Sequence, residues 1–124
     1  MGNPYLDKFG KTLMSKVRDS AIRNWDMILD GRMKGDMANN IRQELSTFSD
    51  EQRELVYRLI PNIVDTTLHY LLWAIEQEHS IEVIQSLDNN DRADVAEISD
   101  GLPGELYTKE GWIERFSTQR YEEP

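Results

Sequence analysis

Apolar residues recur at helical spacing along the first thirty residues of the chain. Viewed down a helix at about 100° per residue, they fall on one stripe, and Asn24 lies near its centre. The stripe consists of Leu6, Phe9, Leu13, Val17, Ser20, Ala21, Asn24, Met27 and Ile28. Asn3 and Pro4 favour a helix start, because Asn is a preferred N-cap and Pro fits the first helical position. Since Gly31 readily ends a helix, the pattern predicts one amphipathic helix over residues 4–29.

Two more helices are indicated before residue 80. A short one over residues 36–48 is predicted by apolar residues spaced four apart, which are Met37, Ile41 and Leu45. Ser49 and Gln52 then form a capping box, in which each side chain accepts a hydrogen bond from the backbone amide of the other residue. A long helix is therefore expected from about residue 50 to residue 78.

Pro61 falls inside this long helix and is expected to kink or break it, because its ring disfavours helical geometry in the preceding residue. After Pro61, apolar side chains point nearly all round the helix. A helix that is apolar on every side is typically buried. Residues 62–78 are therefore predicted to form the central core helix.

The C-terminal part of the chain is harder to interpret by period. Apolar residues between 81 and 87 fit a helix or a strand, and we favour a helix. A helical turn is expected at Val95 and Ile98, a turn over residues 100–104, and a last short helix around Trp112. The sequence thus predicts an all-α single domain over residues 1–124. It would be a bundle of four to six helices around a kinked central helix at about 50–78, with most of the core supplied by residues 1–75.

Composition excludes several classes of protein. The chain has no cysteine, so it has no disulfide, thiolate zinc site or thiol nucleophile. Its N-terminus lacks the apolar segment of an export signal, and no stretch approaches the roughly 18 apolar residues of a membrane span. We expect a bacterial-type cytoplasmic protein that does not enter the membrane.

The net charge of −9 is unevenly distributed. Residues 1–75 hold ten acidic and ten basic residues, whereas residues 76–124 hold thirteen acidic and four basic residues. Binding to phosphates requires clustered Lys and Arg. Nucleic acid is therefore not an expected partner.

Four polar residues share one face of the predicted core helix: Asp65, His69, Glu76 and His79. Glu76 and His79 have the spacing found in di-iron bundles, but such sites need a second Glu-x-x-His and the chain has only two histidines. We therefore expect no metal and no cofactor. Asp65 and His69, four residues apart, are interpreted as a pair at the core margin. With Asn24 and Trp25 they also offer an alternative, a polar floor for a small-ligand pocket.

Acidic residues recur at three-residue steps after position 87: Asp88, Asp91, Asp94, Glu97 and Asp100. They do not match an EF-hand, since Ala93 stands where the calcium loop requires Gly and Ser99 where it requires Glu. The run is typical of a solvated face. Alternatively, Asp88, Asp91, Asp94 and Glu97 contact a basic protein.

The segment 100–117 is rich in Gly and aromatic residues, which suits a turn followed by a docking helix. It resembles the closing stretch of small bacterial proteins that carry no assigned function, and the resemblance implies no activity. No hydrolase, Walker, Rossmann, kinase or zinc-peptidase motif is found.

Two functions remain as hypotheses. The first is a non-enzymatic interaction module, of the inhibitor or immunity type, whose acidic C-terminal half contacts a basic partner. The alternative is a helical domain that binds a small ligand, and acts on it if it is an enzyme, near Asn24, Trp25, Asp65 and His69. Small helical domains often self-associate, so a homodimer is a further expectation.

Overall fold

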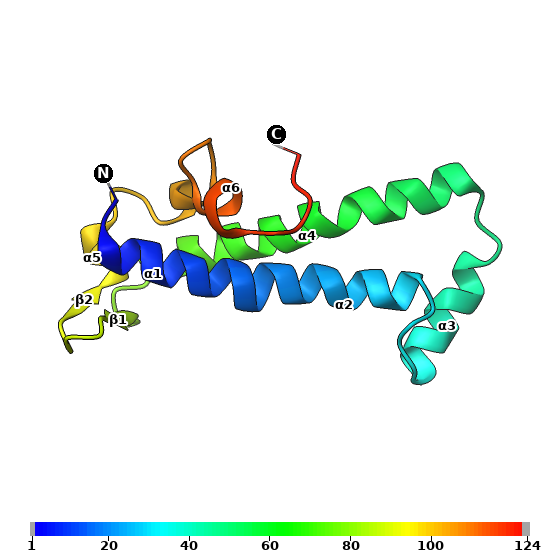
Figure 1. The fold of residues 1–124 in the computed structure, drawn as a ribbon, viewed down its shortest axis with the longest axis horizontal. Coiled ribbons are helices and arrows are strands. Elements are labelled where there is room, and N and C mark those ends of the chain that lie inside the picture. Colours follow the sequence, from blue (N-terminus) through cyan, green and yellow to red (C-terminus); the bar gives the residue numbers. More distant parts are fainter. Residues whose placement is uncertain (1, 123–124) are drawn as a thin grey trace.

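The computed structural model describes residues 2–122, which form a mostly helical fold. The elements are α1 (Pro4–Thr12), η1 (Leu13–Arg18), α2 (Asp19–Leu29), α3 (Asp36–Leu45), α4 (Asp50–Gln77), β1 (Ile84–Ser86), β2 (Arg92–Asp94), α5 (Val95–Ile98), η2 (Pro103–Leu106) and α6 (Trp112–Phe116). The first three elements make one continuous rod, and α4 runs antiparallel beside it (Figure 1). α3 joins the two rods at one end, and the two strands lie at the other.

The N-terminal rod begins as predicted, with the Asn3 side chain accepting hydrogen bonds from the amides of Tyr5 and Leu6. Its middle, η1, is a π-helix, in which the Asp19 amide donates to the Met14 carbonyl five residues back. Five of the buried positions along the rod step by four residues: Leu6, Gly10, Met14, Arg18 and Ile22. In an α-helix such steps drift by about 40° each, and the wider π turn offsets the drift.

This change of phase makes the predicted stripe partly wrong. Val17 is 43% exposed, and Asn24, expected at the centre of the buried face, is exposed as well. The buried face instead receives the charged side chains of Arg18 and Asp19. Helical period locates the rod, but not which of its sides is covered.

The capping box that starts α4 is confirmed. The Gln52 amide donates to Ser49 Oγ at 3.1 Å, and the Ser49 amide donates to Gln52 Oε1 at 2.8 Å. α4 continues through Pro61 without the break that was one of the two expected outcomes. The expectation that the helix is buried on all sides is wrong, because Ile63 and Tyr70 are each 61% exposed. Among the described residues, no helix has both the length and the hydrophobicity to cross a bilayer.

Residues 84–94 form an antiparallel hairpin in place of the favoured helix. Ile84 pairs with Asp94, and Ser86 pairs with Arg92. The connection needs a left-handed residue, and Asn90 supplies it with φ 69°. Turn chemistry therefore decided this segment, and apolar spacing did not. The predicted helical turn that follows is present as α5, and the Asp94 side chain caps it by accepting from the Ala96 amide.

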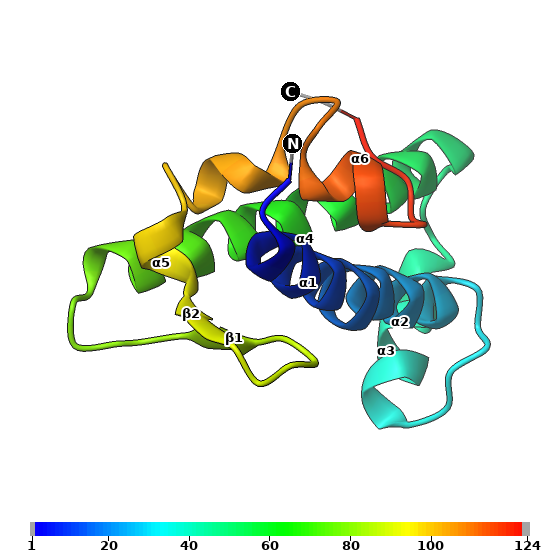
Figure 2. The same cartoon turned by 60° about the vertical axis from the view of Figure 1, so that its left-hand side comes forward.

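The main core lies at the end of the rods where the C-terminal elements gather (Figure 2). Its buried members are Leu6, Met14, Leu68, Leu72, Val95, Leu102, Leu106, Trp112 and Ile113. Residues 1–75 supply eight of the thirteen buried apolar side chains among the described residues, as expected. Within this cluster, however, five of the nine buried members come from residues 95–113. The acidic half of the chain is thus also the half that closes the core.

Trp112 fixes α6 against α1 by close packing on Gly10. The indole also meets the Phe9 ring edge-to-face at 5.7 Å between centroids. A Cβ atom at Gly10 would overlap the indole ring. Gly10 is therefore required by the close approach of these two helices.

We predict that Gly10→Ala lowers the free energy of unfolding by about 1–2 kcal/mol. Displacing Trp112 costs more than the roughly 1 kcal/mol that alanine contributes to helix propensity. Urea denaturation followed by circular dichroism measures the change. Gly104→Ala is the control, since a Cβ there meets nothing within 4 Å. Equal stability of the Gly10→Ala protein and the unaltered chain would contradict the prediction.

Candidate functional site

Asp65 does not pair with His69; it forms a buried ion pair with Arg18. Arg18 Nε donates to Asp65 Oδ1 at 2.6 Å, and Arg18 Nη2 donates to Asp65 Oδ2 at 3.1 Å. The Arg18 side chain is 0% exposed. The interaction is bidentate, which is the strongest geometry for these two groups. It joins the N-terminal rod to α4.

The remaining donors of Arg18 hold the C-terminal tail. Arg18 Nη1 donates to Ser117 Oγ at 2.7 Å, and Nη2 donates to the Arg120 carbonyl at 2.8 Å. Ser117 in turn donates to Asp19, which also accepts from the Thr118 amide and hydroxyl. The tail is therefore tied directly to the N-terminal rod, and through the Arg18–Asp65 pair to α4.

A second ion pair completes this attachment. The Arg120 guanidinium donates to both carboxylate oxygens of Asp26 at 2.8 and 3.0 Å, and to the Tyr57 carbonyl at 2.7 Å. It also stacks over the Tyr57 ring, 3.4 Å from the centroid. Asp26 lies on α2 and Tyr57 on α4, so Arg120 bridges the same two rods as Arg18.

His69 forms a hydrogen bond with a residue of the loop after η2. Its Nδ1 atom and the Tyr107 hydroxyl form a hydrogen bond of 2.8 Å. Burial raises the pKa of the Tyr107 hydroxyl, and the nearby Asp65 carboxylate and Tyr70 raise it further. The phenol is thus held in its neutral, hydrogen-bonding form. The expected Asp65–His69 pair is wrong, because each residue has a stronger partner from another element.

The residues proposed for a small-ligand pocket do not share a polar floor. Asn24 is exposed, Trp25 is 38% exposed, and the Asp65 carboxylate is occupied by Arg18. The three principal concavities of the described surface are lined by other residues. The prediction that Asn24 borders this pocket assumed an uninterrupted α-helical period along the first thirty residues, and the π-helix η1 interrupts that period.

The acidic run is divided between two kinds of structure. Asp88 and Asp91 lie in the hairpin connection, whereas Asp94 caps α5 and Glu97 lies on it. Asp88 is exposed and meets Lys8 at 3.4 Å. In residues 2–122, no group of three or more acidic or histidine side chains is arranged to hold a metal ion. These carboxylates surround one end of the molecule instead of lining one helix.

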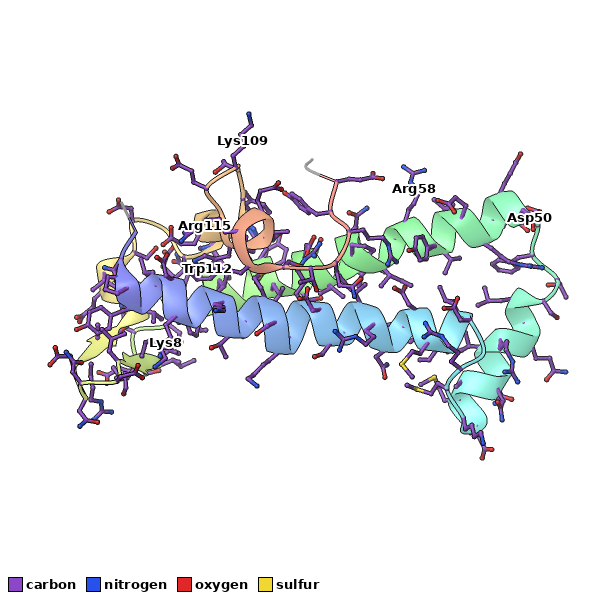
Figure 3. The ribbon with its side chains drawn as sticks, in the orientation of Figure 1. Lys8, Asp50, Arg58, Lys109, Trp112 and Arg115 are labelled. Carbon is purple, nitrogen blue, oxygen red and sulfur yellow. The ribbon has the colours of Figure 1, made fainter. Side chains whose placement is uncertain are left out.

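At this end the structure shows a polar concavity that the sequence did not predict. It has a volume of about 590 Å³, and its lining includes Asp7, Asp100, Glu105, Lys109 and Arg115. Asp7 belongs to α1, Glu105 to η2 and Arg115 to α6. Figure 3 shows Lys109 pointing away from the fold, whereas Arg115 and Trp112 point back toward α1. The concavity is therefore assembled from the N-terminal residues 2–7 and from residues 98–115.

Negative charge in the concavity is only partly compensated. Arg115 forms an ion pair of 3.0 Å with Asp7 and stacks 4.5 Å over the Phe116 ring centroid. Burial raises the pKa of Glu105; Asp100 and Asp7 add to the rise, while a hydrogen bond from Ser99 and the charge of Arg115 oppose it. The rise means that burial and the neighbouring carboxylates outweigh the opposing effects. A cation entering the concavity would relieve this repulsion.

Sequence reasoning missed Asp7, Glu105 and Arg115 because they are distant in the chain and follow no common spacing. Asp100 was recognised as the last member of the acidic run, and it was the one carboxylate of the concavity that a sequence pattern indicated. Burial of Glu105 depends on how η2 packs against α4 and α6, which the sequence does not reveal.

We predict that Asp65→Asn lowers the free energy of unfolding by about 3–5 kcal/mol, because it leaves the buried Arg18 guanidinium without a counter-charge. Arg18→Met combined with Asp65→Leu is expected to recover part of this loss. Urea denaturation measures both variants, with the exposed Asp50→Asn as control. A loss below about 1 kcal/mol for Asp65→Asn would contradict a buried ion pair.

We predict that Glu105→Gln raises the melting temperature at neutral pH. The folded state raises the pKa of Glu105 above its ordinary value of 4.5, so the ionised carboxylate destabilises the fold above the folded-state pKa. As pH falls through that pKa to below 4.5, the carboxyl group is protonated in both states and the difference should vanish. Thermal denaturation across this pH range tests it. A difference that grows as the pH falls would refute the stated sign.

In comparisons with known proteins, no family model, curated protein or solved structure matches the chain.

Proposed function

We propose that this protein is a non-enzymatic interaction module that receives a lysine or arginine side chain of a basic partner protein in the concavity beside Glu105. The observation that carries the proposal is the gathering of four carboxylates, those of Asp7, Asp100, Glu105 and Glu110, around a concavity whose lining holds two basic side chains, Lys109 and Arg115. The raised pKa of Glu105, caused first by burial and then by Asp100 and Asp7, agrees with this excess of acidic groups. A cationic side chain placed between Glu105 and Asp100 would supply the missing counter-charge. This interaction would gain from the partly desolvated surroundings.

The size and surroundings of the concavity support the same role. Its volume of about 590 Å³ lies in the range of small binding sites, which is ample for one long side chain. Exposed carboxylates on the neighbouring hairpin and α5 extend the acidic surface, among them Asp88, Asp91 and Glu97. Such a surface accelerates encounter with a basic protein. An inhibitor or immunity-type protein would use this arrangement to hold a basic target.

The test uses an octa-lysine peptide as the probe, titrated into the full chain by calorimetry. We expect the double variant Asp100→Asn with Glu105→Gln to weaken binding at least about tenfold, because two charge-assisted contacts are lost. Binding by the unaltered chain should also weaken steeply with salt. The matched control is Glu44→Gln with Asp50→Asn, which removes the same charge from the opposite end of the molecule (Figure 3).

The control distinguishes binding of the peptide at the concavity from a response to the net charge of the protein. If both double variants weaken binding equally, the peptide responds to overall charge and the proposed site is refuted. The same holds if binding is unchanged in the concavity variant. Circular dichroism of the double variant checks that it is folded, so that a loss of binding can be assigned to the concavity.

A further inference from the structure

The outward face of α4 carries a regular apolar seam with no partner among the described residues. Its positions alternate four and three residues apart: Leu59, Ile63, Thr66, Tyr70, Trp73 and Gln77. This is the a/d spacing by which two helices pack against each other. Ile63 and Tyr70 are each 61% exposed, and Trp73 is 49% exposed. The opposite side of α4, which includes Leu68 and Leu72, is already buried in the core of its own chain.

Charge is absent from this face. The exposed residues of α4 from Leu59 to Gln77 contain no Asp, Glu, Lys or Arg, although 30% of the whole chain is charged. The two threonine hydroxyls of this face already donate hydrogen bonds to the backbone of α4. Thr66 Oγ1 donates to the Asn62 carbonyl and Thr67 Oγ1 to the Ile63 carbonyl, each at 2.8 Å. A low content of charged residues and an enrichment in aromatic residues are typical of the centre of a protein interface.

The order of residues along the seam is complementary to itself. Two copies can be placed antiparallel and related by a two-fold axis at the level of residue 68. Each seam position of one copy then lies opposite a seam position of the other: Tyr70 opposite Thr66, Trp73 opposite Ile63, and Gln77 opposite Leu59. Each larger side chain then lies opposite a smaller or aliphatic one, as close packing requires. A two-fold interface demands this reciprocity, in which residue i contacts j and j contacts i.

From these observations we infer that α4 pairs with α4 of a second copy of this chain, antiparallel and centred on residue 68. Two chains of net charge −9 repel each other wherever acidic surfaces meet, and the uncharged seam avoids that repulsion. A basic partner would gain nothing from this face and would be attracted to the acidic end instead. The seam spans about 27 Å at the helical rise, so the contact extends along the C-terminal two-thirds of α4.

Sedimentation equilibrium over a range of concentrations tests the pairing. We expect a mass rising toward twice the 14.5 kDa of one chain, and rising further with added salt because salt screens the repulsion between acidic copies. This salt response is opposite to that of the acidic concavity, so one inference can fail without the other. A chain that stays monomeric up to about 1 mM would overturn the inference.

Two variants locate the interface. Ile63→Glu and Tyr70→Glu are each expected to raise the dimer dissociation constant at least about tenfold, because a carboxylate would be buried unpaired. Both side chains are exposed in one copy, so the fold should persist, and circular dichroism checks this. Met37→Glu adds the same charge at a 55% exposed apolar position on α3 and should change the constant less than about twofold. Equal effects of all three variants would overturn the assignment to the seam.

Cross-linking tests the register. Because the chain has no cysteine, Ile63→Cys and Trp73→Cys can be labelled without background. The antiparallel register predicts that a short thiol cross-linker joins the two variants when they are mixed, and joins neither variant to itself. Cross-linking of Ile63→Cys to itself would indicate a parallel pair and refute the register. A monomer that binds neutral phosphatidylcholine vesicles through this face would mean that lipid, and not a second copy, is the occupant.

Discussion

The buried guanidinium of Arg18 is the constraint on which the arrangement of the chain depends. Removing a guanidinium from water is costly unless its donors find acceptors and its charge finds a counter-charge. Asp65 of α4 supplies the charge, and Ser117 with the Gln119 and Arg120 carbonyls supplies the other acceptors. The two rods and the tail therefore satisfy one group together. Loosening any of the three leaves polar atoms unpaired, so these distant segments are expected to unfold cooperatively.

That network also explains why one side of α4 is buried and the other is exposed. The tail is held through Arg18 on the side of Asp65, η2 packs on α4, and α5 and α6 pack on α1, so that together they complete the core beside Leu72. Within residues 2–122, no element covers the opposite side, where Ile63 and Tyr70 are exposed. The seam from Leu59 to Gln77 is left facing outward. A single layer of helices closed on one face thus produces an apolar surface as a direct consequence of its topology.

The same assembly creates a surface of opposite chemistry at the end of the rods. Packing of α6 against α1, and of η2 against α4 and α6, brings Glu105 close to Asp7 and Asp100, and the pKa of Glu105 rises because its charge is partly desolvated among other carboxylates. Such a position lowers stability in the free protein and is relieved by a cation. Salt screens the attraction between an acidic surface and a cation and also the repulsion between acidic copies, so contacts at the concavity and at the uncharged face would respond to salt in opposite ways.

The sequence by itself determined the features that arise from interactions within a few residues. The Asn3 cap, the Ser49–Gln52 capping box and Gly31 set the limits of the two rods, because each acts on amides or carbonyls of its own helical turn. The tertiary structure decided the rest: the π segment that turned Asn24 outward, the partner of Asp65, the exposed side of α4 and the meeting of Asp7 with Glu105. These depend on which elements pack together, and packing is a balance between residues up to about a hundred positions apart that no local pattern records.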